Sequence, residues 1–140
     1  MDIPVKKLKS GFELPEFGLG TWQMGGKDEP DASNDTAEIA AIKAAIEAGV
    51  THIDTAEAYG AGHAEELVGE AIRGINRKKL FITSKVSEEN HTCEGIPESC
   101  KKSLKRLGTT YLDLYLLHEF STECPLKEAV EALDALVDEG

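Results

Sequence analysis

Two rhythms of apolar residues alternate along this chain. Short runs rich in apolar and β-branched residues predict four strands, over 17–22, 50–56, 80–86 and 111–118. Apolar residues three or four positions apart predict four helices, over 36–49, 64–75, 96–108 and from Pro125 onward. This alternation predicts an α/β fold of four consecutive βα units, with a parallel sheet and right-handed crossovers.

The helical stripes indicate which residues face the sheet. In the helix predicted over 96–108, Cys100 falls on the apolar stripe, so we expect it in the core. In the last helix, Val130, Leu133 and Val137 form the stripe that we expect to face inward.

A hairpin is predicted ahead of the first strand. Short alternating runs flank Ser10 and Gly11, which indicates a β-hairpin over 5–16. The 140 residues are the length of one domain, so we expect a single domain over 1–140 in which 17–140 holds the four βα units.

Composition excludes some classes of function. The net charge of −11 argues against a nucleic-acid surface, which needs clustered Lys and Arg. No apolar run approaches the roughly 20 residues of a membrane span, and the N-terminus lacks the apolar segment of a signal peptide. We therefore expect a cytoplasmic protein that binds neither nucleic acid nor membrane.

Cysteine and histidine spacing gives no sign of a metal. The three cysteines, Cys93, Cys100 and Cys124, form no C-x-x-C pair, so we expect neither a disulfide framework nor a zinc site. The four histidines show no ligand spacing; they are His52, His63, His91 and His118.

Three predicted strands end in ionisable residues. Asp54 ends the second strand, Lys85 the third and His118 the fourth, at separations of 31 and 33 residues, or one βα unit each. The carboxyl ends of parallel strands meet at one edge, where α/β folds place their chemistry, so we expect these groups at the same level there. Tyr59, in the loop leaving the second strand, is within reach.

This combination predicts acid–base chemistry. A lysine ammonium beside a tyrosine favours the phenolate, so Lys85 would make Tyr59 a proton donor near neutral pH. Asp54 would keep Lys85 charged, and His118 could orient a carbonyl oxygen or share its proton. Each residue alone has an ordinary explanation, as an ion pair, a core histidine or a packed tyrosine. Their coincidence at one edge favours an active site.

Other polar residues are predicted to be structural. His52 precedes Asp54 by two positions and shares its face, so we expect it to be buried and hydrogen-bonded one layer deeper. We place His63 and His91 in loops without a role. Asp113 interrupts an apolar strand, and we expect it to act as a structural acceptor near the strand's start.

Four blocks of this chain resemble those of the aldo-keto reductases, closest to prokaryotic members. They are GLGTWQMGG, GVTHIDTAEAYGAGHAEELVGEAI, LFITSKV and RLGTTYLDLYLLH, in the family's order and spacing. The resemblance implies the N-terminal half of a TIM (β/α)8 barrel, whose first hairpin plugs the bottom. It also implies that Asp54, Tyr59, Lys85 and His118 are the family's catalytic tetrad.

The resemblance also implies an activity. It is the reversible reduction of an aldehyde or ketone, a small carbonyl substrate, to an alcohol, with hydride from nicotinamide C4 of NADPH. Tyr59 would supply the proton, Lys85 and Asp54 would tune it, and His118 would position the substrate oxygen.

The resemblance also implies part of a cofactor site. Gly20, Thr21 and Trp22 match the first βα loop, which borders the nicotinamide in the family together with Asp54. A (β/α)8 barrel has about 250 residues, so this chain of 140 residues matches only its N-terminal half. Most of the NADP site would lie in the C-terminal half, which is absent here. The preference for NADP over NAD is implied only by the cofactor that members of the family commonly use.

Several alternatives stay open. The chain is a fragment of a longer protein, a half barrel that self-associates through the open edges of its first and fourth strands, or a natural truncated product. Its function is carbonyl reduction, or that of a non-catalytic half-barrel module such as a structural or nucleotide-binding subunit. The carbonyl substrate is not readable, because later loops shape the pocket in the family.

Overall fold

The computed structural model describes residues 2–9 and 11–140. Six strands are present, β1 (Val5–Lys7), β2 (Glu13–Pro15), β3 (Gly18–Gly20), β4 (His52–Asp54), β5 (Phe81–Val86) and β6 (Leu114–Leu117). The α-helices are α1 (Asp35–Glu47), α2 (His63–Ala71), α3 (Gly95–Leu107) and α4 (Leu126–Glu139). Short 3-10 turns are η1 (Ala32–Asn34), η2 (Tyr59–Gly62), η3 (Arg77–Lys79) and η4 (Glu88–Asn90).

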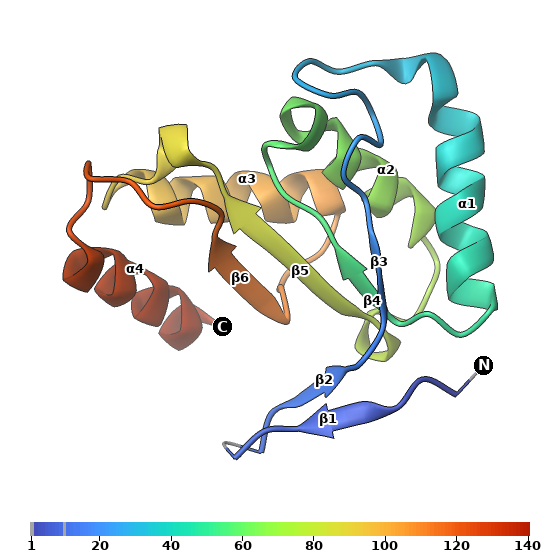
Figure 1. Ribbon diagram of the computed structural model, residues 1–140, viewed down its shortest axis with the longest axis horizontal. Helices are drawn as coiled ribbons and strands as arrows, with labels where there is room; N and C mark the ends of the chain where they lie inside the picture. Colours follow the sequence, from blue (N-terminus) through green and yellow to red (C-terminus); the bar gives the residue numbers. More distant parts are fainter. Residues whose placement is uncertain (1, 10) are drawn as a thin grey trace.

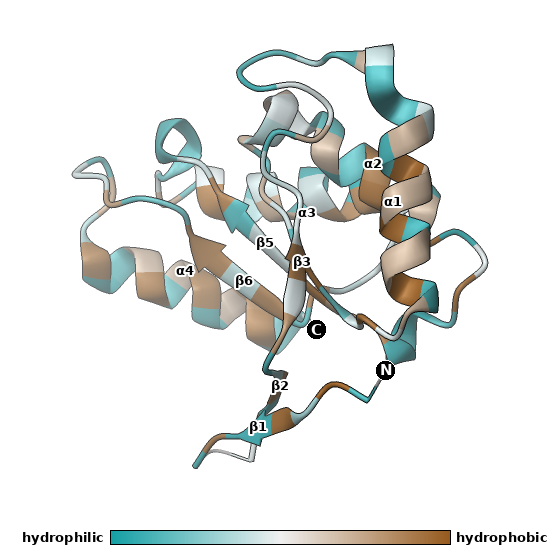
Figure 2. Cartoon of the chain, turned by 45° about the vertical axis from the view of Figure 1, so that its right-hand side comes forward, coloured by the Kyte–Doolittle hydropathy of each residue, from teal (hydrophilic) through white to brown (hydrophobic). Residues whose placement is uncertain are grey.

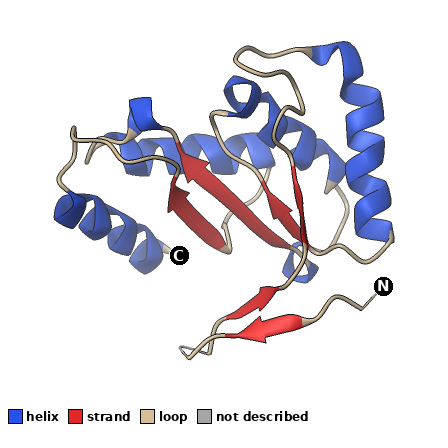
Figure 3. Ribbon diagram, viewed as in Figure 1, coloured by secondary structure: helices blue, strands red, loops and turns tan. Residues whose placement is uncertain are grey.

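The four βα units form one parallel sheet, in the order β3-β4-β5-β6 (Figure 1). This confirms the predicted alternation, although most strands are shorter than their apolar runs. β1 and β2 pair as the predicted antiparallel hairpin. The described residues of the hairpin form no hydrogen-bonded part of the parallel sheet and lie at the amino ends of its strands (Figure 3). Ser10, predicted in the hairpin turn, lies outside the described residues.

Alternating side chains divide the sheet into two faces. Ile53 and Ile82 point towards the helices and are fully buried. The larger apolar cluster joins them to residues of α1, α2 and α3; its buried members are Ile42, Ile53, Leu67, Val68, Ala71, Ile72, Leu80, Ile82 and Leu107. In Figure 2 apolar colouring accordingly concentrates on the helices and strands, and much of the loop chain is hydrophilic.

The opposite face carries polar and aromatic residues. His52 and Phe81 are neighbours there, with ring centroids 5.0 Å apart, and Phe12 of the hairpin packs edge-on against Phe81 at 5.5 Å. Gly18 lies opposite His52, and a Cβ at that position would come within 2.8 Å of the imidazole. The hairpin thus covers the amino end of this face and leaves the carboxyl end free for chemistry.

The prediction for α4 is partly wrong. Val130 and Val137 are 53% and 76% exposed, whereas Ala129 is fully buried beside Val86 of β5. Leu133 belongs to both possible stripes, so helical spacing alone permits either face. The small Ala129 lets the helix approach the sheet closely, which is why packing selected the stripe of Ala129, Ala132, Leu133 and Leu136.

The expectation about cysteines is also corrected. Cys93 and Cys124 form a disulfide, with Cα atoms 5.3 Å apart. They are 31 residues apart, one βα unit, which is the spacing that juxtaposes Asp54 and Lys85. Cys100 is free and buried, as its place on the α3 stripe predicted.

Candidate active site

The structure brings the four predicted catalytic residues together at the carboxyl edge. Asp54 ends β4, Lys85 is near the end of β5, and His118 directly follows β6. Tyr59 begins the turn η2 after β4.

The predicted equal level is wrong in detail. Asp54 pairs with Thr83, and Lys85 pairs with Leu116, so each catalytic residue lies two positions beyond the register partner of the previous one. An even offset keeps all three on one face. Such a stagger is the shear that a barrel requires.

Lys85 is the centre of the site. Its Nζ donates to Asp54 Oδ2 at 2.9 Å, to the Thr55 carbonyl at 2.9 Å and to the Tyr59 hydroxyl at 3.2 Å. These three acceptors match the three protons of an ammonium group. Because the Lys85 side chain is only 13% exposed, the Asp54 carboxylate offsets much of the cost of burying its charge.

His118 completes the cluster by packing against Tyr59. The two rings pack edge to face, with centroids 5.4 Å apart. Burial lowers the pKa of His118, and the nearby Lys85 ammonium lowers it further. His118 is therefore neutral at pH 7, with one ring nitrogen available as a hydrogen-bond donor.

A left-handed turn aims Tyr59 at the edge. Gly60 and Gly62 have φ of +56° and +95°, and Ala61 between them is also left-handed. A Cβ at Gly60 would collide with the carbonyl of Gly25, so glycine is needed there for space as well as for conformation.

Glu57 anchors the loop that carries Tyr59, a role that sequence reasoning missed. Its backbone N–H donates to the Lys85 carbonyl at 3.3 Å. Its buried Oε1 accepts from the Ser87 N–H at 2.7 Å, from the Ser87 hydroxyl at 3.0 Å and from Asn90 Nδ2 at 3.1 Å. The loops that follow Asp54 and Lys85 are thereby tied together.

A buried ion pair supports this arrangement from the helix side. Glu65 is fully buried; its Oε2 accepts from Arg106 Nε at 2.6 Å and its Oε1 from the Ser84 hydroxyl at 2.5 Å. Arg106 Nη2 also lies 3.8 Å from Glu57 Oε2. The sequence signal was an acid on the apolar stripe of α2, in phase with Val68.

The candidate cofactor residues lie beside Asp54. Thr21 is buried, and its N–H and hydroxyl donate to the Asp54 carbonyl at 3.0 and 3.2 Å. Gly20 pairs with Asp54 in the register, and a Cβ there would meet nothing within 4 Å. Trp22 is 66% exposed. Gly20 thus borders open space next to Asp54.

Two other predicted residues make structural contacts, although His52 is only partly buried and not buried as predicted. His52 Nε2 is 3.0 Å from the Thr83 hydroxyl on the neighbouring strand. Asp113 Oδ2 accepts from Arg77 Nη2 at 2.7 Å and from the Ile82 N–H at 2.8 Å, just before β6.

The loop position predicted for His63 is wrong, whereas His91 does lie in a loop, between η4 and α3. His63 begins α2 and bridges two helices, with Nε2 2.9 Å from Asp35 and Nδ1 2.8 Å from Glu66. His91 is 1% exposed, and its Nδ1 lies 3.1 Å from the Glu119 carbonyl. The His63–Asp35 and His91–Glu119 contacts each join residues 28 positions apart, which no local pattern reveals.

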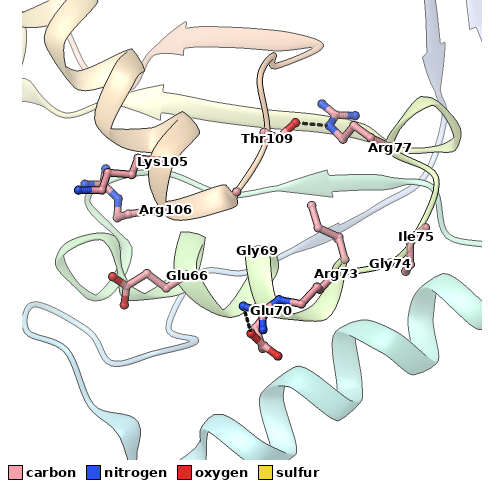
Figure 4. A pocket seen from close by; sticks show the side chains of 12 residues that line it. Glu66, Gly69, Glu70, Arg73, Gly74, Ile75, Arg77, Lys105, Arg106 and Thr109 are labelled. Atoms are coloured by element: carbon pink, nitrogen blue, oxygen red, sulfur yellow. Dashed lines mark hydrogen bonds and ion pairs between the residues drawn. The ribbon is translucent and has the colours of Figure 1, made fainter.

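A pocket on the helix side is separate from this chemistry. It lies between α2 and α3 and is lined by residues that include Glu70, Arg73, Arg77 and Thr109, but by none of the tetrad (Figure 4). Two of its arginines already have partners: Arg73 pairs with Glu70 at 2.6 Å, and Arg77 donates to Thr109 at 3.1 Å.

A metal site near the tetrad is not present among the described residues. The group with suitable ligand atoms within 4.8 Å of one another is Cys93, Cys124 and Glu128, and its two sulfurs are bonded to each other. In the same described part of the chain, no helix combines the length and apolarity needed to cross a membrane.

The fold and site together define an α/β protein whose parallel sheet carries Asp54, Tyr59, Lys85 and His118 at its carboxyl edge, and the comparisons identify the family. The profile of the Aldo/keto reductase family matches residues 16–140, so the chain belongs to that family. Its four βα units match half of the family's TIM barrel.

Individual relatives agree with this assignment. Methylglyoxal reductase YeaE of Escherichia coli (strain K12) is 47% identical over 96% of this chain and 45% of its own length. Glyoxal reductase of Bacillus subtilis (strain 168) is 40% identical over 96% of this chain and 45% of its own length. The chain thus spans about half the length of the curated relatives it matches.

Solved structures give the same result. The thermostable aldo-keto reductase Tm1743 superposes with a TM-score of 0.94 at 45% identity, over 99% of this chain and 51% of that one. An aldo-keto reductase from Klebsiella pneumoniae in complex with NADPH gives 0.85 at 43% identity, over 100% and 47%.

Proposed function

We propose that this chain carries the catalytic tetrad of a reductase that converts aldehydes and ketones reversibly to alcohols. The observation that supports it most directly is the contact of the Lys85 ammonium with both the Tyr59 hydroxyl and the Asp54 carboxylate. A plain structural ion pair has no need of a tyrosine hydroxyl on the same ammonium.

Tyr59 is the proton donor in this proposal. As negative charge develops on the carbonyl oxygen, the Tyr59 hydroxyl transfers its proton, and the resulting phenolate is stabilised by Lys85 Nζ at 3.2 Å. Asp54 and the Thr55 carbonyl hold the ammonium in place, so little reorganisation accompanies the transfer.

His118 orients the substrate oxygen. Because its lowered pKa keeps it neutral at pH 7, it can donate one hydrogen bond to the carbonyl oxygen without competing as the acid. Its ring packs against the Tyr59 ring, so both donors address the same place.

We propose that the nicotinamide end of NADPH binds at the corner formed by Gly20, Trp22 and Asp54. Gly20 leaves open space beside Asp54, and the Trp22 ring is exposed at the same corner. A bound nicotinamide supplies hydride to the carbonyl carbon. We propose that the contacts to the rest of the cofactor come from the half of the barrel to which this chain does not correspond.

Names of relatives suggest the substrate class. A methylglyoxal reductase and a glyoxal reductase are 47% and 40% identical to this chain. We propose a small reactive aldehyde as substrate, and methylglyoxal is the probe that follows from these relatives.

The test begins with cofactor binding. NADPH is titrated into the 140-residue chain while the emission of Trp22 is followed, which has one source because Trp22 is the single tryptophan. Saturable quenching supports an assembled cofactor site. Unchanged emission in a chain shown to be folded by circular dichroism means that this chain does not assemble one by itself.

Turnover then tests the proton donor. NADPH consumption with methylglyoxal is compared among wild type, Tyr59→Phe and the matched control Tyr111→Phe, whose tyrosine lies before β6 against Arg77. We expect Tyr59→Phe to lose about 10²–10⁴-fold in kcat with NADPH binding intact, and Tyr111→Phe to remain active. Undiminished turnover in Tyr59→Phe refutes the assignment.

A second candidate rests on the sheet edges. Among the described residues, β3 and β6 each pair on one side only, and Leu116 of β6 is 37% exposed. We propose that the chain self-associates through these edges, as a half barrel or as a non-catalytic module. Analytical ultracentrifugation should then show a dimer whose fraction rises with concentration; a monomer at all concentrations contradicts the proposal.

A further inference from the structure

Two cysteines join the segments that follow the catalytic strands. Cys93 lies between η4 and α3, eight residues after Lys85, and Cys124 lies before α4, six residues after His118. Their disulfide therefore bridges two neighbouring loops at the rim of the candidate active site, and one of these loops begins at His118.

The two sulfurs differ in accessibility. Cys124 is 1% exposed and packs in the smaller apolar cluster with Val86, Ile96 and Ala129, whereas Cys93 is only partly buried. An external reagent can therefore reach Cys93 but not Cys124. This asymmetry is what distinguishes an attacking from a resolving cysteine.

The loops are also joined without the disulfide. His91 Nδ1 lies 3.1 Å from the Glu119 carbonyl, and the His118 N–H donates to the Val86 carbonyl at 3.0 Å. These contacts hold the start of the second loop near the first when the cysteines are reduced. The stretch between Phe120 and Cys124 is attached less closely, because Phe120 is 70% exposed and only Ser121 within the stretch is buried.

We propose that Cys93 and Cys124 form a reversible thiol–disulfide site whose oxidant is a low-molecular-weight disulfide, and that its oxidation fastens residues 119–124 at the active-site rim. The redox chemistry stands independently of the reductase activity. Only the consequence of fastening residues 119–124 for substrate binding rests on the proposed function.

The reaction is a pair of exchanges. The Cys93 thiolate attacks one sulfur of the small disulfide, a mixed disulfide forms, and one small thiolate leaves. The Cys124 thiolate then attacks the Cys93 sulfur and expels the second small thiolate. The protein loses two electrons, the small disulfide gains them, and the two cysteine protons end on the two small thiols. Glu128 Oε2 lies 3.3 Å from Cys93 Sγ, and the Cys93 proton passes to solvent when the thiolate forms.

Cys100 provides an internal control. It is buried, and burial followed by the charge of Glu65 raises its pKa, so it remains a thiol under conditions that oxidise the other two. The variant Cys100→Ser should form the disulfide as the wild type does.

The first experiment follows the chemistry by mass spectrometry. The reduced chain is equilibrated with mixtures of reduced and oxidised glutathione, trapped by alkylation and digested. We expect the Cys93–Cys124 bond to form and to be lost again within the accessible range of ratios. We expect Cys124→Ser to accumulate glutathione on Cys93, and Cys93→Ser to keep Cys124 as a free thiol. A pair that stays oxidised or stays reduced at every ratio overturns reversibility, and glutathione on Cys124 in Cys93→Ser overturns the assigned order.

The second experiment measures the loop in wild-type protein, so it requires no variant to fold. Amide hydrogen exchange is compared between the oxidised and reduced chain. We expect residues 119–124 to exchange about tenfold faster after reduction, with α1 and α2 unchanged. Equal exchange in both states overturns the proposal, and so does faster exchange throughout the chain, which would make the disulfide a general structural cross-link.

Discussion

The buried pair of Glu65 and Arg106 allows a sharp test of how the site is supported. In Arg106→Met, the Glu65 carboxylate keeps its bond to Ser84 but loses the guanidinium at 2.6 Å. Leaving a buried charge without its partner costs about 3–5 kcal/mol. We expect about 3 kcal/mol, the lower end, because Arg106 is 21% exposed and water can partly replace it.

Urea unfolding followed by far-ultraviolet circular dichroism measures this loss. With a slope of roughly 1.5–2 kcal/mol per molar, the midpoint should fall by about 1.5–2 M. Trp22 emission is unsuitable here because the ring is 66% exposed already. The matched control is Lys105→Met, which removes the same charge from an exposed neighbouring position on α3 and should shift stability by less than about 0.5 kcal/mol.

A further measurement isolates the unpaired charge as the cause. Adding Glu65→Gln to Arg106→Met should recover part of the stability, since it removes that charge. If Arg106→Met costs no more than Lys105→Met, the pair does not support the fold and this reasoning is refuted.

Three other perturbations test the fold. Gly18→Ala places a Cβ 2.8 Å from the His52 ring and should cost about 1–3 kcal/mol in urea unfolding; an unchanged midpoint would show that the ring moves freely. Asp113→Asn weakens the acceptor for Arg77 Nη2 and for the Ile82 N–H of β5, and it should lower the free energy of unfolding by about 2 kcal/mol. Coinciding thermal unfolding curves of the variant and the wild type would contradict this. The hydrogen bond to Glu66, and after it the one to Asp35, raises the pKa of His63. The stability that protonated His63 gives to the fold is therefore complete below about pH 6.5 and is lost as pH rises through the raised pKa. His63→Gln should therefore be less stable than wild type near pH 5.5, and the gap should close as pH rises through the raised pKa of His63; a gap that widens with pH would contradict this.

Sequence reasoning reached the elements and the tetrad because both depend on regular spacing. Strand–helix alternation repeats every 30-odd residues, so residues one period apart return to the same sheet edge. Asp54, Lys85 and His118 were found in this way. The extent of the domain, the catalytic roles and the cofactor residues stay predictions until the assays above are done.

The same spacing argument would have found the disulfide. Cys93 and Cys124 are one period apart, as Asp54 and Lys85 are. Their number is odd and they form no C-x-x-C pair, so cysteine motifs give no sign of the bond; it depends on which loops become neighbours in the fold.

The sequence by itself determined the α/β class, the order of strands, the hairpin and the edge where the chemistry gathers, because these follow from periodicity and from the chemistry of individual side chains. Tertiary structure alone decided which stripe of α4 faces the sheet, the two-residue stagger of the strands, and the burial of Glu57, Glu65 and His91. Those outcomes depend on which distant side chains fill the same space and satisfy the same hydrogen bonds, and such pairings leave no local pattern in the chain.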